Sequence, residues 1–242
     1  MPQSHFPQRR HLCPGRKAVG YKQGGFTLIE IAIVLVIIGL LLGGILKGQE
    51  LINSARVKNL GTDFRNIPLF IYGYQDKFKA LPGDDPLVAT HLTGATLATT
   101  PGATGNGVIE GSWDSTTATD ESYLFWQHVR LAGLAPGVTD PNAAGYLPTN
   151  ASGGTIGIQS GTTIAVSSPI QAGGVGISGA YIICSKGILG KFVKQLDTQM
   201  DDGKTDSGSM MATKTTGYAI GALAEPTATI DDALTYTVCM GV

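Results

Sequence analysis

The hydrophobic pattern changes character twice, near residue 46 and near residue 80. From Phe26 to Leu46 the chain is almost continuously apolar over 21 residues, which as a helix reach about 31 Å, the thickness of a bilayer's hydrocarbon core. We therefore expect a membrane-spanning helix, interrupted by the carboxylate of Glu30. Because an ionised side chain is costly in hydrocarbon, Glu30 either lies close enough to the interface to stay hydrated or meets a positive group of a neighbouring molecule.

Between residues 47 and 80 the uniform run becomes amphipathic. Apolar residues recur at steps of three and four, which places one stripe along a helix: Leu60, Phe64, Ile67, Ile71, Tyr74 and Phe78. We interpret this segment as a continuation of the helix, with its stripe covered by the domain that follows. Pro68 is expected to kink the helix or weaken one turn, and Gly61 and Gly73 to loosen it. The Pro-Gly-Asp-Asp-Pro turn at 82–86 is expected to end it.

Residues 81–242 predict a head of mixed helices and strands. Turn residues and alternating apolar positions predict the following elements: loops over 87–119, a helix from Asp120 to about Ala132, β structure over 155–184 that includes Ile164 and Val166, a short helix over 188–200, and a last strand from Leu234 to Met240. The predicted fold class is α+β. A long N-terminal helix, membrane-spanning in its first half and amphipathic in its second, packs against a head that contains antiparallel strands.

The distribution of charge adds an orientation to this arrangement. Of 17 basic side chains, five lie in residues 1–25, a segment with no acidic residue. By the positive-inside rule this segment stays in the cytoplasm and the head is exported. The remainder has 12 basic against 18 acidic side chains, a charge of about −6, without a basic patch, which argues against nucleic acid as a partner. No small-residue cleavage site follows the apolar run, so it is not an ordinary secretory signal.

The sequence Gly25-Phe26-Thr27-Leu28-Ile29-Glu30, followed by an apolar run, resembles the N-terminal signature of type IV prepilins and of the related pseudopilins of type II secretion. The resemblance covers roughly residues 20–80 and implies a pilin-like fold. It implies that a prepilin peptidase cuts after Gly25 and methylates the new amino terminus at Phe26. It also implies that Glu30 serves methylation and assembly by pairing with the N-terminal amine of an adjacent subunit. Many members have a helix-kinking proline just past the apolar run, where this chain has Lys47.

This resemblance leads to a functional hypothesis and a division of the chain. Residues 1–25 are a leader that is removed, 26–46 the transmembrane and filament-core helix, 47–80 its amphipathic continuation, and 81–242 an extracytoplasmic head. The chain is then a structural subunit of a type IV pilus-like helical filament. Its expected partners are copies of itself or other pilins, the prepilin peptidase, an inner-membrane assembly platform, and membrane lipid before assembly. Its location is the bacterial inner membrane, and later a pilus at the cell surface or a periplasmic filament.

Two alternatives remain open. The chain could be a pseudopilin of a type II secretion system, although its large head favours a pilus. It could also be a membrane-tethered binding or adhesin domain that uses the prepilin export route. Trp113, expected to be exposed in a polar loop, is the one residue that suggests a ligand pocket.

Cysteine usage bears on the compartment. Cys13 lies in the leader, which leaves Cys184 and Cys239 in the mature chain. In an oxidising compartment two cysteines in one domain favour a disulfide. The alternative is two buried free thiols, since both cysteines lie in apolar surroundings.

Signals for catalysis or metal binding are weak. An acidic cluster at Asp197, Asp201, Asp202 and Asp206 lacks the spacing of a calcium loop, so we expect a solvated structural turn. His91 and His128 have no metal-ligand spacing and are expected to be surface or packed residues. Motifs for phosphate binding, a nucleophile elbow or a Cys-x-x-Cys site are absent from the sequence. We expect no enzyme activity, no metal and no cofactor.

Overall fold

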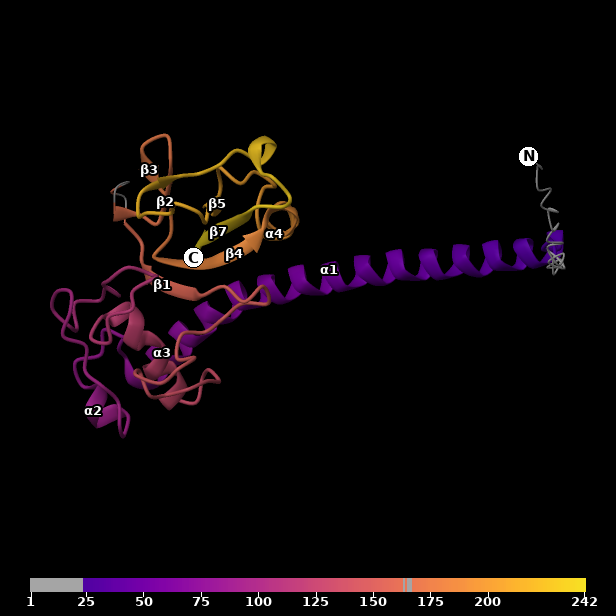
Figure 1. Ribbon diagram of the computed structural model, residues 1–242. Coiled ribbons are helices and arrows are strands. Elements are labelled where there is room, and N and C mark those ends of the chain that lie inside the picture. Colours follow the sequence, from indigo (N-terminus) through magenta and orange to yellow (C-terminus); the bar gives the residue numbers. More distant parts are fainter. Residues whose placement is uncertain (1–23, 163, 165–166) are drawn as a thin grey trace, which may run out of the picture. The chain divides into compact units, whose positions relative to one another are not determined.

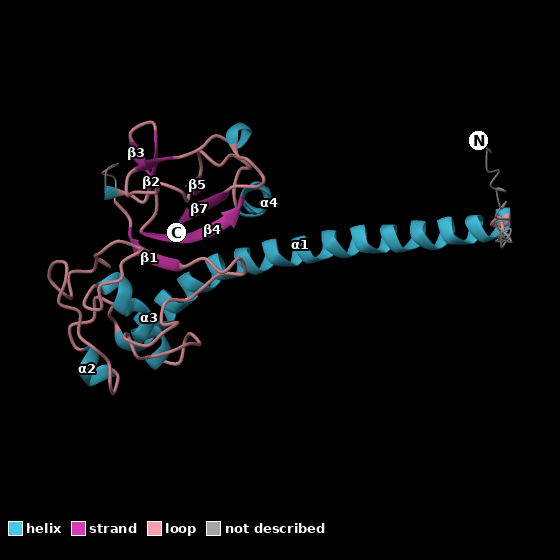
Figure 2. Cartoon of the chain, viewed as in Figure 1, coloured by secondary structure: helices cyan, strands magenta, loops and turns pink. Residues whose placement is uncertain are grey.

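The structure is a computed structural model that describes residues 24–162, 164 and 167–242. It divides into two compact units, the chain up to Lys47 and Gly48–Val242. In chain order (Figures 1 and 2) the elements are α1 (Leu28–Phe78), α2 (Val88–His91), α3 (Glu121–Leu131), β1 (Ile156–Ser160), β2 (Ile170–Ala172), β3 (Val175–Gly176), β4 (Tyr181–Leu189), α4 (Gly190–Met200), β5 (Met210–Lys214), β6 (Ala222–Leu223), the 3₁₀ turn η2 (Thr227–Thr229) and β7 (Thr235–Gly241).

In the first unit, the apolar run forms the beginning of α1. Every residue from Gly24 to Leu46 is exposed, and the helix is long and apolar enough to cross a membrane. Since no described part of the chain covers this apolar surface, it needs lipid or other proteins around it.

In the second unit, the rest of α1 buries the predicted stripe. Leu60, Phe64, Ile67, Ile71 and Tyr74 are buried, together with Val57 and Gly61, and Phe78 is partly buried. The helix is unbroken across Pro68 and ends at Phe78. Gly61 and Gly73 do not interrupt it; they admit close neighbours, because a Cβ there would lie 3.4 Å from the Met200 sulfur and 3.1 Å from a Leu134 methyl group.

A four-stranded sheet with the strand order β1-β4-β7-β5 forms the centre of the second unit, and all its neighbouring strands are antiparallel. The pairing of β4 with β7 shifts register between Ser185 and Ile188, where Gly187 has a φ of +78°. A smaller sheet has the order β3-β2-β6, in which β2 and β6 are parallel. The predicted α+β class with an antiparallel head is therefore confirmed.

The two faces of the large sheet bury different side chains, as the two-residue period of strands requires. Ile183 and Val238 belong to the core cluster that also contains Phe64 of α1, Phe125 of α3 and Phe192 of α4. Ile182, Cys184 and Cys239 lie in a second cluster with residues of the smaller sheet. The sheet is thus buried on both faces, which explains why its strands read as nearly continuous apolar runs.

Several element boundaries differ from the predictions. Ile188 and Leu189 continue β4, and α4 begins at Gly190. A Cβ at Gly190 would lie 2.1 Å from the Asp231 carbonyl oxygen, so the strand-to-helix turn requires glycine. Ile164 forms only an isolated bridge, to Val175, and Val166 lies outside the described residues. The sequence analysis also missed α2, β5 and β6, whose periodicity is too short to be recognised.

The helix predicted from Asp120 is present as α3, but its start is built differently. Asp120 occupies the N-cap position without a side-chain cap hydrogen bond. Its carboxylate instead accepts hydrogen bonds from the Thr100 hydroxyl at 2.7 Å and the Ser115 hydroxyl at 2.6 Å. Asp120 therefore ties the preceding loop to the start of α3.

Candidate functional site: the start of helix α1

Thr27 and Glu30 form a reciprocal cap at the start of α1. The Glu30 carboxylate accepts the Thr27 backbone N–H and the Thr27 hydroxyl, each at 2.8 Å. The Glu30 N–H in turn donates to the Thr27 hydroxyl oxygen at 3.3 Å. This arrangement is a capping box, which satisfies two of the amides that a helix start leaves without partners.

The capping box gives Glu30 a role that the sequence analysis missed. The Thr-x-x-Glu spacing before an apolar run is its sequence signal. The carboxylate also lies at the positive end of the helix dipole. Local hydrogen bonds thus offset part of the cost of an acid beside an apolar run.

The Gly25–Phe26 peptide lies outside the helix, one residue before Thr27. Gly24 to Thr27 have no regular secondary structure, and the Phe26 side chain is 84% exposed. Among the described residues, none lies within 4 Å of the position that a Cβ on Gly24 or Gly25 would take. An exposed, irregular peptide is the form of backbone that a peptidase can bind. A cut there would leave a new amine on Phe26, four residues before Glu30.

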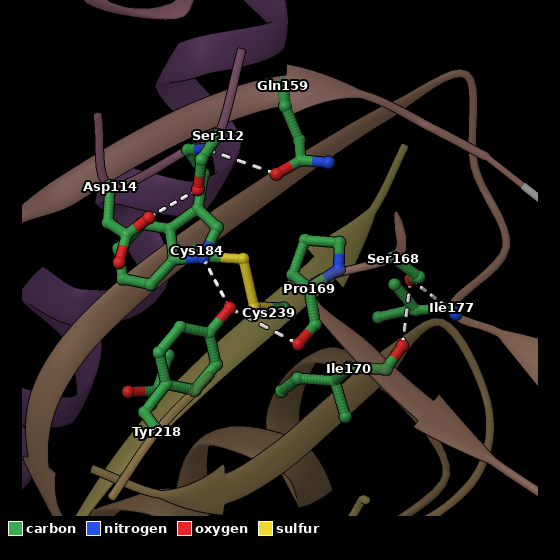
Figure 3. The surroundings of a disulfide bond; sticks show 12 residues. Ser112, Asp114, Gln159, Ser168, Pro169, Ile170, Ile177, Cys184, Tyr218 and Cys239 are labelled. Atoms are coloured by element: carbon green, nitrogen blue, oxygen red, sulfur yellow. Dashed lines mark hydrogen bonds between the residues drawn. A yellow bond between two sulfur atoms is a disulfide. The ribbon is translucent and has the colours of Figure 1, made fainter. Parts of the chain in front are cut away.

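The Cys184–Cys239 disulfide is present and joins β4 to β7, where the two residues are direct cross-strand partners (Figure 3). Both sulfur-bearing residues are fully buried. Figure 3 shows Tyr218 beside the bond, where its hydroxyl donates to the Pro169 carbonyl at 3.2 Å. The disulfide lies inside the second core cluster, so its role is to hold the head together.

Trp113 is not exposed, contrary to the expectation. It is 2% exposed and its indole N–H donates to the Tyr218 hydroxyl at 2.6 Å. A Cβ on Gly157 of β1 would lie 1.8 Å from the Trp113 carbonyl oxygen, so the loop that carries Trp113 lies directly on that strand. The residue that suggested a ligand pocket is therefore part of the core, and this argument for a binding domain is lost.

The last three acids of the cluster, Asp201, Asp202 and Asp206, lie in the turn after α4, as expected, whereas Asp197 lies within α4 and is not solvated. Asp197 is 1% exposed, and its burial together with the nearby Asp201 and Asp202 raises the pKa of its carboxyl to about 6. Asp201 accepts the Met210 N–H, and Asp202 accepts the Lys204 N–H, both at 2.8 Å. Across the described residues, no group of three metal-ligating side chains could hold an ion.

The two histidines of the head serve packing and loop connection. His128 is buried; its Nδ1 accepts the Gly83 N–H and its Nε2 lies 2.9 Å from the Thr96 carbonyl oxygen, so it is neutral with the proton on Nε2. Burial lowers its pKa. His91 Nδ1 lies 2.6 Å from the buried Asp85 carboxylate, beside a cavity of about 460 Å³ at the end of α1.

A family model described as the prokaryotic N-terminal methylation motif matches residues 20–46. Searches of curated proteins and of solved structures found no match. The matched segment contains the whole site described above, from Gly25 through the capping box into the apolar helix.

The chain therefore carries the signature of type IV prepilins and pseudopilins. The motif supports membership of that family of structural proteins, whose precursors are processed by prepilin peptidase and assemble into filaments. The motif and the long apolar helix are consistent with a membrane-anchored precursor.

Proposed function

We propose that the chain is a non-enzymatic structural subunit of a type IV pilus-like helical filament. Prepilin peptidase removes residues 1–25 by cutting after Gly25 and methylates Phe26. Residues 26–46 then span the inner membrane and afterwards pack in the filament core, while 47–80 connect them to the exported head at 81–242. Other subunits and an inner-membrane assembly platform are its partners. After processing, the subunit is incorporated into a pilus at the cell surface.

The single observation that supports the proposal most strongly is that the methylation motif leads directly into an apolar helix whose surface is exposed. Leu35, Leu40 and Leu41 are each at least 60% exposed, although burial of a leucine contributes about 1.5–3 kcal/mol. A helix that no described part of its own chain covers can exchange lipid for copies of itself. The charge on Glu30 can then pair with a terminal amine in the low-dielectric filament interior.

The test separates the charge of Glu30 from its capping role. Glu30→Gln keeps an oxygen that can accept the Thr27 N–H but removes the charge, whereas Thr27→Ala removes the hydroxyl and keeps the charge. We expect Glu30→Gln to leave the membrane level of the protein unchanged and to reduce sheared filaments by at least about tenfold, roughly 1.4 kcal/mol. Thr27→Ala should still assemble.

Filament yield is measured in sheared fractions, with the N-terminal peptide identified by mass spectrometry. Recovery of normal amounts of Glu30→Gln filaments would limit the carboxylate to capping and contradict the charge-pairing step. A wild-type chain that is processed at Phe26 but stays in the inner-membrane fraction would favour the pseudopilin alternative, because the methylation motif is shared by both classes.

A further inference from the structure

The loop between α2 and α3 contains an Asn106–Gly107 pair, both residues of which are exposed to solvent. Asparagine is among the thermolabile residues of proteins. It is most labile before glycine, because glycine has no side chain to hinder attack of its backbone nitrogen on the asparagine side chain. The sequence of this loop therefore carries a site of spontaneous chemical modification.

The backbone conformation of the loop accounts for this pair of residues. Gly107 has a φ of +82°, which favours glycine over residues with a side chain. The Asn106 Oδ1 accepts the Val108 N–H at 2.9 Å, an Asx turn that favours asparagine at this position. A less labile pair would therefore strain the backbone or remove the hydrogen bond of the turn.

The carboxylate of Asp84, in the turn after α1, binds the backbone of the same loop. It accepts the N–H of Gly107 at 2.7 Å, that of Asn106 at 3.2 Å, and also that of Gly105. Asp84 is 3% exposed, so water competes little for these contacts. Three consecutive amides that converge on one buried carboxylate fix the conformation of the loop.

We propose that Asn106 is a deamidation site that Asp84 keeps closed while the loop is in place. In the reaction, the Gly107 nitrogen loses its proton and forms a C–N bond to the side-chain carbonyl carbon of Asn106. The side-chain amide nitrogen takes up the proton and leaves as ammonia. Water then opens the resulting cyclic imide, which leaves an aspartate or an isoaspartate at position 106.

The contacts of the loop oppose this attack. The proton that Gly107 must lose is donated to a carboxylate, whose negative charge disfavours its removal. The Asn106 side chain is held on the Val108 N–H, and the peptide bond that follows Asn106 is fixed because its own N–H and the preceding one are both bound. Deamidation therefore requires the loop to open, and its rate follows the open fraction. Because the reaction is irreversible, modified chains record how long the loop has been open.

The experiment follows the side-chain amide of Asn106 in the full chain, in detergent micelles and mildly alkaline buffer. The amount of deamidated product is measured by mass spectrometry of the proteolytic peptide that contains Asn106. Loss of the amide should be at least about tenfold slower in the folded chain than in the same chain unfolded in urea, because a hydrogen bond to a charged group shifts an opening equilibrium by that factor or more. This comparison needs no variant to fold.

Two variants separate the contact of Asp84 from a general loosening of the loop. Asp84→Ala should accelerate deamidation of the folded chain at least about tenfold. Asp120→Ala is the matched control, because Asp120 holds the same connection between α2 and α3 through the hydroxyls of Thr100 and Ser115. It should leave the rate at Asn106 unchanged. Tryptophan fluorescence checks that each variant is folded.

Hydrogen exchange of the wild type replaces the first variant if Asp84→Ala does not fold. The Gly107 amide should exchange at least about tenfold more slowly, relative to its intrinsic rate, than the Gly102 amide of the same loop. Gly102 is also exposed, and its N–H has no acceptor among the described residues.

Four results would overturn the proposal. One is a folded wild type that loses the Asn106 amide as fast as the unfolded chain does. Another is a folded Asp84→Ala that deamidates as slowly as the wild type. A third is equal acceleration by Asp120→Ala, which would indicate loosening of the loop as a whole. The fourth is exchange of the Gly107 amide as fast as that of Gly102.

Discussion

The two halves of helix α1 differ both in their apolar pattern and in their surroundings. In the half up to Lys47 no described residue is buried, and Leu41, for example, is 60% exposed. In the half from Gly48 the apolar residues alternate with polar ones, and Phe64 is 1% exposed. The first half therefore depends on lipid or other proteins for its burial, whereas the second half is covered by its own chain.

This contrast explains why the pattern of each half differs. A helix that is covered on one side needs one apolar stripe, which residues 57–74 provide. A helix surrounded by lipid or by other helices needs apolar residues on all sides, which residues 28–46 provide apart from Glu30. The head can therefore be stable on its own residues, while the first half keeps its apolar surface uncovered.

The largest expected effect is the difference in stability between side-chain truncations in the two halves of α1. Phe64→Ala should reduce the free energy of unfolding of the head by about 4 kcal/mol, because it leaves a cavity in the main core. Leu41→Ala should leave this free energy unchanged. Both are measured by denaturant titration of the full chain in micelles with tryptophan fluorescence. A comparable loss in Leu41→Ala would show that the halves are not energetically separate.

The next effect concerns the disulfide, which lies wholly in the second unit. Replacing both Cys184 and Cys239 by Ala should lower the free energy of unfolding of the head by about 2–4 kcal/mol, because the bond closes a long loop in the unfolded chain. Retention of the protein in the membrane should not change, as measured by carbonate extraction. An unchanged unfolding midpoint would mean that the bond contributes nothing to head stability.

A smaller effect depends on pH and arises from Glu121. Burial and the neighbouring Asp84 and Glu110 raise the pKa of its carboxyl to about 7. The folded head therefore binds a proton that the unfolded chain releases, and this contribution is full below about pH 4.5 and is lost as the pH rises through 7. Glu121→Gln imitates the protonated form and should stabilise the head at pH 8 by on the order of 2 kcal/mol relative to wild type.

The direction of this pH dependence can be checked in the same titration. At pH 4.5 Glu121→Gln and wild type should have similar free energies of unfolding. Neutral, buried His128 acts in the opposite direction: its lowered pKa means that its contribution is present above pH 6.5 and is lost as the pH falls below that value. A Glu121→Gln curve parallel to that of the wild type over the whole range would contradict a raised pKa.

The sequence was sufficient to predict those features that depend on neighbouring or regularly spaced residues. The apolar run, the amphipathic stripe and the prepilin motif were recognised because each is a continuous or periodic feature of neighbouring residues. The pair Cys184 and Cys239 could be proposed because they are the only cysteines in the sequence after the predicted leader. The capping box of Thr27 and Glu30 is likewise predictable from their spacing in the sequence, because it depends only on residues of one helical turn.

The sequence by itself determined the long helix, the division between its exposed and covered halves, the α+β class of the head and the methylation motif. Only the tertiary structure decided that Trp113 is buried, that Asp197 is desolvated, and that the Asp84 carboxylate binds the backbone amides of residues 105–107. These facts depend on contacts between segments far apart in the chain. Glycine-rich strands and short loops specify such contacts weakly, because their register and burial are set by the surfaces they pack against rather than by their own residues.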